Sequence, residues 1–182
     1  MNHGRYDDAY IRDILSTCRT IAVVGASPNP ARPSFFVAKY LSERGFEVYP
    51  INPGQVGKEL AGRPFYGRLA DVPVPIDMVD VFRAPAFVPS VLDQALALSP
   101  LPKVLWLQLG VRHDESAARA EAAGLKVVMD RCPKIEYGRL SGEIGWTGVN
   151  SRTLSSKRPQ RLGSGVQRLS LSRTPKPPAD TQ

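Results

Sequence analysis

The stretch best suited to binding chemistry is a Gly-Ala-Ser turn between a buried strand and a helix. The β-branched run Thr20–Val24 is typical of a strand that is buried on both faces. Gly25-Ala26-Ser27 follows, and from Phe35 onward apolar residues recur at helical spacing. A parallel strand that leads through such a turn into a helix presents backbone N–H groups and the positive end of the helix dipole. Because both attract anions, this stretch is predicted to bind the pyrophosphate of a nucleotide-type ligand.

The elements that must position this turn alternate along the chain. Further helices are expected at Asp7–Cys18, Val88–Leu96 and Asp114–Ala123, and further strands at Glu47–Gly54, Ile76–Arg83, Lys103–Gly110 and Lys126–Asp130. Pro50 lacks an N–H donor, so the second strand is expected to be irregular near its end. The alternation predicts right-handed βαβ crossovers and a mainly parallel sheet with helices on both faces. The fold class is therefore a single, doubly wound α/β domain of three layers.

In such sheets, ligands bind beyond the carboxyl ends of the strands, where the strand order reverses. Besides the Gly-Ala-Ser turn, these ends are predicted at Asn52–Pro53, Phe82–Arg83, Gln108–Gly110 and Asp130–Cys132. The candidate site lies among them.

Composition limits the class of protein. The net charge of +7 is concentrated at the end of the chain: residues 151–182 hold seven Lys or Arg and one Asp, whereas residues 1–150 hold 17 basic and 16 acidic residues. A nearly neutral folded part argues against a nucleic-acid-binding core. The two cysteines lack metal-site spacing, and no signal peptide or bilayer-spanning run is found, so a reducing cytoplasm is expected and no membrane partner.

The nucleotide is not expected to be a nicotinamide dinucleotide that carries a ribose diol. A G-x-G-x-x-G fingerprint would need glycines where Ser27 and Pro30 follow Gly25. An NAD site also needs an acidic residue at the end of the second strand, and this strand ends in Asn52.

Several short motifs in a fixed order resemble the small bacterial CoA-binding proteins. They are Ile21–Ser27, Arg32–Ser34, Pro50–Pro53, Ile76–Val79, Val81–Arg83, Trp106–Gly110 and Val128–Cys132. The resemblance extends over about residues 7–158. This family is similar to the CoA-binding domain of the succinyl-CoA synthetase alpha subunit, a Rossmann-like fold, here without the second domain. The resemblance implies coenzyme A or acyl-CoA as the ligand.

The resemblance also implies roles for individual residues. Gly25, Ala26 and Ser27 would meet the CoA pyrophosphate, together with Arg32 and with Ser34, which is also expected to cap the helix. The remaining assignments are Asn52 and Pro53 beside the ribose or adenine, Lys58 (or Arg63) at the 3′-phosphate, Phe82 and Arg83 on the adenine and pantetheine, and Gln108 and Gly110 along the pantetheine. Phe82 is equally well read as a core residue, and Arg83 and Arg131 as surface partners of Asp80 or Glu136.

Cys132 carries two interpretations. Arg131 and Lys134 beside it are expected to lower its pKa, and a thiolate there would form a mixed disulfide with CoA. The alternative, which we favour, is a half-buried, inert thiol. No catalytic set of Ser/His/Asp, Cys/His or paired carboxylates is recognised, so the function expected is non-catalytic CoA binding as a sensor, carrier or docking module.

Two alternatives remain open at this point. One is an NADP-dependent oxidoreductase in which arginines meet the 2′-phosphate. The other is an interaction protein that acts through its basic end. The predicted organisation is a CoA-binding domain over residues 1–158, with its core at 20–137, and a disordered Ser/Pro/Arg-rich tail at 159–182. The apolar residues between 138 and 158 are expected to wrap the domain or to meet a second subunit, so a homodimer or a protein partner is possible.

Overall fold

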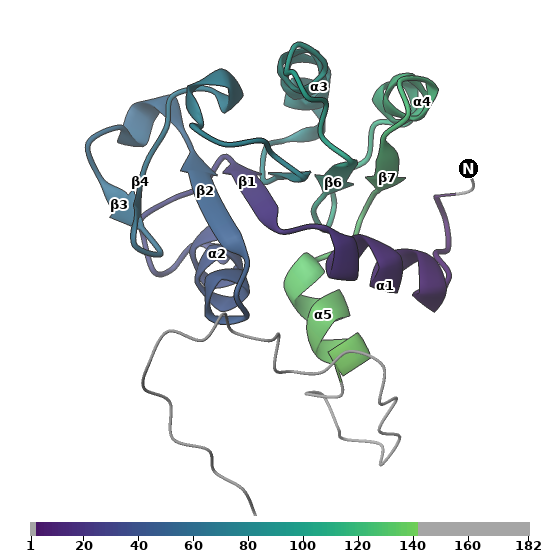
Figure 1. Cartoon of the computed structure of the whole chain (residues 1–182), viewed down its shortest axis with the longest axis horizontal. Helices are drawn as coiled ribbons and strands as arrows, with labels where there is room; N and C mark the ends of the chain where they lie inside the picture. The colour runs from purple at the N-terminus through teal and green to yellow at the C-terminus, as the bar shows by residue number, and fades with distance from the viewer. Residues whose placement is uncertain (1–2, 142–182) are drawn as a thin grey trace, which may run out of the picture.

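The β-branched run Thr20–Val24 forms strand β1 of a five-stranded sheet whose neighbouring strands are all parallel (Figure 1). The structure is a computed structural model, and it describes residues 3–141. The strand order is β2-β1-β5-β6-β7. The other bounds are β2 (Glu47–Ile51), β5 (Met78–Val81), β6 (Val104–Leu107) and β7 (Lys126–Val128). The sequence prediction of a Rossmann-like, doubly wound parallel sheet is confirmed.

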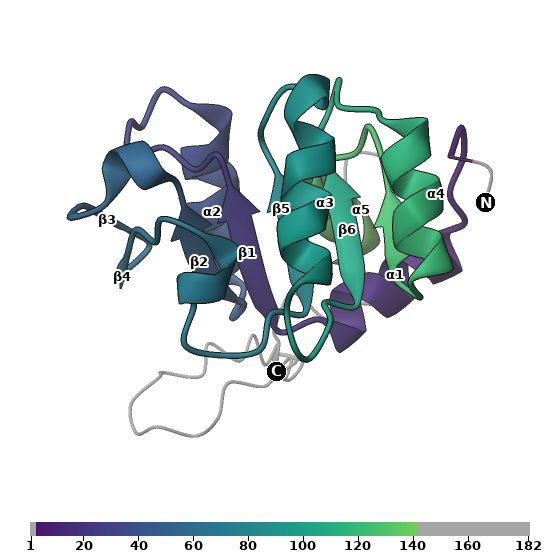
Figure 2. The same ribbon diagram turned by 90° about the horizontal axis from the view of Figure 1, so that it is seen from above.

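Helices cover both faces of the sheet and make three layers (Figures 1 and 2). One face carries α1 (Asp8–Thr17), α2 (Pro33–Glu43) and α5 (Pro133–Ser141), and the other carries α3 (Val88–Leu96) and α4 (Asp114–Ala122). Successive strand residues point to opposite faces, so Met78 belongs to the core beneath α1, α2 and α5, and Val79 to the core beneath α3 and α4. Burial on both faces explains why the strands read as continuous apolar runs.

Short elements connect β2 to β5 and β5 to α3. They are η1 (Pro53–Gln55), the antiparallel pair β3 (Glu59–Leu60) and β4 (Arg63–Pro64), η2 (Leu69–Asp71) and η3 (Pro85–Phe87). Tyr66 forms a bridge to Ile51 along the outer side of β2. The expected irregularity at Pro50 is not observed, because Pro50 pairs in regular register with Val23 and its missing N–H lies on an edge strand.

The N-terminal segment covers the free edge of β7 with two tyrosine hydroxyls. The Val127 N–H donates to the Tyr10 hydroxyl at 3.0 Å, and the Met129 N–H donates to the Tyr6 hydroxyl at 2.7 Å. Tyr10 in turn donates to the Val127 carbonyl at 3.2 Å. Unpaired edge amides invite pairing with another chain, and these phenols satisfy them in place of a sixth strand.

Replacing Tyr10 by phenylalanine is expected to destabilise the fold by about 1–2 kcal/mol, because the N–H and the carbonyl of Val127 both lose a partner in a half-buried position. Urea denaturation followed by circular dichroism measures the change. Tyr66→Phe is the matched control, since no hydrogen bond of the Tyr66 hydroxyl occurs within residues 3–141. Equal stabilities of the two variants would contradict the role assigned to Tyr10.

Strands β2, β5, β6 and β7 are shorter than predicted, and the helices differ from the prediction in two main respects. Helix α2 begins at Pro33 rather than Phe35, since proline is well suited to a first helical position. The sequence does not predict helix α5, because Gly138 interrupts its apolar periodicity. In the folded protein an ion pair of 2.7 Å between Arg139 and Asp8 joins α5 to α1, and such tertiary contacts stabilise a helix that its own sequence pattern does not indicate. The predictions for residues 142–182, including the tail, lie outside the described residues. Within the described part, no helix is both long and apolar enough to cross a bilayer.

Candidate functional site

The strand order reverses at β1, which has β2 on one side and β5 on the other. The chain therefore crosses to opposite sides of the sheet after β1 and after β2, and the loops that leave the carboxyl ends of β1 and β5 diverge. This is the position at which doubly wound folds bind ligands. The Gly-Ala-Ser turn follows β1 and the Phe82–Arg83 segment follows β5, so both predicted segments lie at the reversal point.

The turn after β1 is held in shape by its neighbours. Gly25 adopts a φ of +82°, and its N–H donates to the Ile51 carbonyl at 2.9 Å. The Asn52 side-chain amide donates to the Ala26 carbonyl at 2.8 Å, which ties the turn to the end of β2. The left-handed conformation at Gly25 directs the chain from the strand toward α2.

Ser34 does not cap α2 as expected. The N-cap position belongs to Arg32, whose side chain makes no capping hydrogen bond and is exposed to solvent. Ser34 lies inside the first turn, is buried, and its hydroxyl accepts the Ser27 N–H at 3.1 Å. Of the three turn amides, those of Gly25 and Ser27 thus have protein acceptors, and among the described contacts only that of Ala26 has none.

A cleft of about 290 Å³ adjoins the turn on the α3 side of the sheet. Its lining consists of Val24, Gly25, Ile51, Asn52, Pro53, Gly67, Arg68, Arg83, Phe87, Ser90, Val91 and Gln94. The Arg83 guanidinium lies 4.5 Å from the centre of the Phe87 ring, which is 49% exposed. An arginine stacked on an exposed aromatic ring forms a flat, positively charged wall suited to a nucleotide. The Arg83 guanidinium thus lies on Phe87, whereas Asp80, considered above as its surface partner, is fully buried.

The predicted residues divide into groups by location. Gly25, Asn52, Pro53 and Arg83 line the cleft, and Ala26, Ser27, Arg32 and Ser34 make or flank the turn. The remaining four lie elsewhere: Phe82 is half-buried against the core, the Lys58 ammonium donates to the Gln55 amide oxygen at 2.9 Å, Gln108 is buried, and the Gly110 N–H donates to the Asp130 carboxylate at 2.8 Å.

Gln108 turns toward the interior, where it holds a carboxyl group that the sequence analysis did not assign to the site. Its side-chain amide nitrogen lies 2.9 and 3.1 Å from the two Asp80 oxygens. Asp80 is fully buried in β5, and burial raises its pKa to about 8 although the Gln108 hydrogen bond acts against this. Burial therefore favours the neutral, protonated form of Asp80. The sequence signal was a lone acid inside the apolar run Met78–Val81.

Cys132 is buried, and the expected lowering of its pKa is wrong. Burial raises the pKa of the thiol, and this effect outweighs hydrogen bonds from the Ile135 and Lys134 amides and the nearby lysine charge. The inert-thiol interpretation is the one that agrees with this environment.

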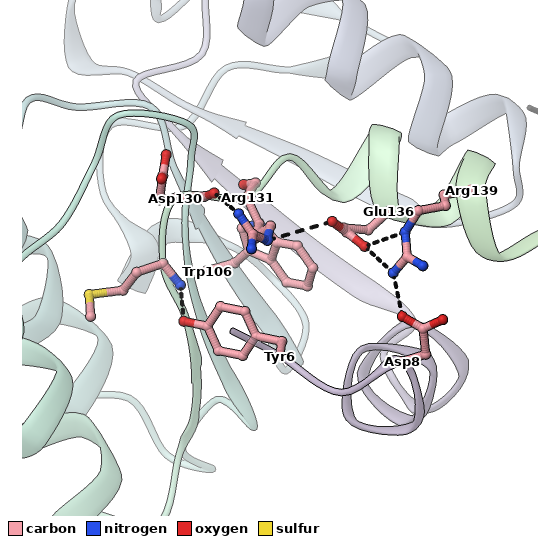
Figure 3. Close-up of polar contacts among 8 residues, drawn as sticks. Tyr6, Asp8, Trp106, Asp130, Arg131, Glu136 and Arg139 are labelled. Carbon is pink, nitrogen blue, oxygen red and sulfur yellow. Dashed lines mark hydrogen bonds and ion pairs between the residues drawn. The ribbon is translucent and has the colours of Figure 1, made fainter. Parts of the chain in front are cut away.

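The neighbouring charges form a structural network (Figure 3). The Trp106 indole donates to the Arg131 carbonyl at 2.7 Å, and Arg131 lies 3.8 Å from Glu136. Glu136 also pairs with Arg139 at 2.7 Å, which reaches Asp8 of α1. The predicted Arg131–Glu136 pair is confirmed, and its role is to join the end of β7 to α5 and α1.

Eight of the twelve residues that line the cleft are not among the predicted site residues, and four of the eight carry polar or aromatic side chains: Arg68, Phe87, Ser90 and Gln94. These four come from the loop after β4, from η3 and from α3, and no local pattern shows that these segments line one cleft. Within residues 3–141, no group of three or more His, Cys, Asp or Glu side chains is arranged to hold a metal ion.

Comparison with known proteins places these features in a family. The family model described as a CoA binding domain matches residues 19–138. The uncharacterised protein YneT of Bacillus subtilis is 34% identical over 129 residues, which are 71% of this chain and 93% of that protein. The solved structure of cell-free ID.343 from Thermus thermophilus is 42% identical with a TM-score of 0.70, covering 74% of this chain and 99% of that chain.

A part of a larger enzyme is also similar. The alpha subunit of ADP-forming acetate–CoA ligase I of Pyrococcus furiosus is 34% identical over 86 residues, which are 45% of this chain but only 19% of that subunit. The small relatives, in contrast, are covered almost completely. Residues 19–138, which the family model matches, contain both the Gly-Ala-Ser turn and the cleft. The resemblance found in the sequence is therefore confirmed, and the chain belongs to the family of CoA-binding domain proteins.

Proposed function

We propose that the protein binds coenzyme A or an acyl-CoA reversibly and without catalysing a reaction on it, as a sensor, carrier or docking module. The observation that carries the proposal is the juxtaposition of the turn after β1 with the cleft walled by Arg83 and Phe87. The turn offers the Ala26 amide to a pyrophosphate, Arg32 adds its charge, and the cleft offers a stacking wall to the adenosine.

The comparisons support this ligand. The name of the Pyrococcus subunit identifies a ligase that acts on CoA, and this chain is similar to a small part of it. The small relatives match this chain over nearly their full lengths, which supports a CoA-binding unit that works without the rest of such a ligase. Both cysteines are free thiols, as we expect of a protein that works in the reducing cytoplasm.

Isothermal titration calorimetry with CoA, acetyl-CoA and NADPH tests the proposal. We expect saturable binding of CoA or acetyl-CoA and none of NADPH at the same concentration. Tight NADPH binding without CoA binding would instead support the oxidoreductase alternative. A failure of CoA, acetyl-CoA and 3′-dephospho-CoA to bind at millimolar concentration would reject the proposed function.

Arg32→Ala is expected to weaken CoA binding by about 1.5–3 kcal/mol, the range for a hydrogen bond to a charged group. The side chain is exposed and holds no capping hydrogen bond, so stability should change little. Lys39→Ala, another exposed cation on α2, is the control for a general loss of positive charge. Equal affinities of Arg32→Ala and the unmodified protein would remove Arg32 from the site.

A further inference from the structure

CoA differs from 3′-dephospho-CoA by one phosphate on the ribose, and binding it selectively needs a cation near the nucleoside. The family resemblance implies Lys58 or Arg63 at this position. In the structure neither lines the cleft: Lys58 bonds to Gln55. Arg63 lies 3.3 Å from Glu47 and 4.3 Å from the centre of the Tyr49 ring.

Two arginines do line the cleft, and they come from different segments. Arg83 follows β5 and lies beneath Gly25, with its guanidinium on Phe87. Arg68 follows β4 and precedes η2. No carboxylate pairs with Arg83 among the described contacts, so the lining of the cleft keeps the positive charge of this side chain. A phosphate that enters beside Arg68 is attracted by both.

Among the described contacts, Asp71 is the residue that fixes the Arg68 side chain. The Asp71 carboxylate accepts the Arg68 backbone N–H at 2.9 Å with one oxygen and a guanidinium N–H at 2.9 Å with the other. A guanidinium has five N–H donors, and in the described structure the others of Arg68 have no acceptor. The side chain is 74% exposed. Asp71 therefore orients the guanidinium while most of its donors stay available at the mouth of the cleft.

Gly67 permits this arrangement. A Cβ atom there would lie 3.3 Å from the Asp71 carboxylate, closer than most such contacts allow. The glycine thus lets Asp71 approach the backbone of Arg68 closely.

We propose that Arg68 binds the 3′-phosphate of CoA and so makes the protein select CoA over 3′-dephospho-CoA. This inference rests on the proposed function, because it assumes that the adenosine end occupies the cleft. Arg68 is a specificity residue: it contacts the one group that the two ligands do not share, while Arg32 and the turn after β1 bind the pyrophosphate common to both.

Titrations of the unmodified protein, Arg68→Ala and Lys58→Ala with CoA and with 3′-dephospho-CoA test the inference. We expect the unmodified protein to prefer CoA, and Arg68→Ala to lose about tenfold or more in CoA affinity while its affinity for 3′-dephospho-CoA stays unchanged. Lys58→Ala should behave like the unmodified protein with both ligands. Raising the salt concentration should reduce the preference of the unmodified protein and leave that of Arg68→Ala as it is.

Each other result overturns a distinct claim. Equal weakening of both ligands in Arg68→Ala would show that Arg68 acts on a shared group and not on the 3′-phosphate. A loss of preference in Lys58→Ala alone would assign the phosphate to Lys58. If neither ligand binds the unmodified protein, the proposed function itself fails, whatever Arg68 does.

Discussion

Gly25→Ala is expected to lower the free energy of unfolding by about 2–4 kcal/mol and to weaken CoA binding at least tenfold. Its Cβ would lie 2.9 Å from the Arg83 Cδ atom and 3.1 Å from the Phe82 carbonyl oxygen, at a φ of +82° that disfavours any L side chain. The close contact with Arg83 means that the substitution also displaces one wall of the cleft. Denaturant unfolding and calorimetric titration measure the two effects.

Gly57→Ala separates backbone strain from crowding. Gly57 also has a positive φ, +92°, but no atom lies within 4 Å of the position of its Cβ. It should therefore show only the conformational cost of about 1 kcal/mol and normal CoA affinity. If both variants bind CoA as the unmodified protein does, the turn after β1 is only a connection between strand and helix, and the site lies elsewhere.

The second large effect is on the pH dependence of stability. We expect the free energy of unfolding to fall by about 2–4 kcal/mol between pH 5 and pH 8 through Asp80 alone. Burial raises the pKa of Asp80 from 3.8 to about 8, so in this range the folded protein holds a proton that the unfolded chain has released. Raising the pH therefore favours the unfolded chain until the folded-state pKa is passed.

Asp80→Asn isolates this contribution, since asparagine cannot titrate and the Gln108 amide can rotate to present its oxygen. From pH 5 to pH 8 the unmodified protein should therefore lose stability relative to Asp80→Asn, so that the free energy of unfolding of the variant minus that of the unmodified protein becomes more positive. Other groups, such as His3, whose pKa burial lowers, act alike in both proteins and cancel. Asp114→Asn, at an exposed position, is the control. Parallel pH profiles for unmodified protein and Asp80→Asn would show that Asp80 is ionised in the folded state.

The same buried pair includes Gln108, a residue that the sequence predicts for the binding site. Asp80 lies within β5 and, like Met78 two residues before it, faces the side of the sheet covered by α1, α2 and α5, whereas the cleft lies on the α3 side. The Gln108 amide is held by Asp80 in the interior, and Gln108 does not line the cleft. This differs from the role predicted for it along the pantetheine.

The sequence by itself determined the architecture of the domain and the position of the Gly-Ala-Ser turn within it. Buried parallel strands must be apolar on both faces, and helices must show a period of 3.6, so local patterns alone define the alternation that leads to a doubly wound sheet. The turn from Gly25 to Ser27 was recognisable because a glycine after a buried strand and a helix start after it are neighbours in the chain.

Only the tertiary structure decided what each side chain of the site contacts. Ser34 reaches back to Ser27, Gln108 turns inward to Asp80, and Arg68 enters the cleft, each through a partner whose position depends on how loops and strands pack. Burial likewise raises the pKa of Cys132 where its charged sequence neighbours alone indicated the opposite. Periodicity reports which face of an element is apolar, but desolvation and hydrogen bonding depend on residues far away in the chain, and these become neighbours only in the folded protein.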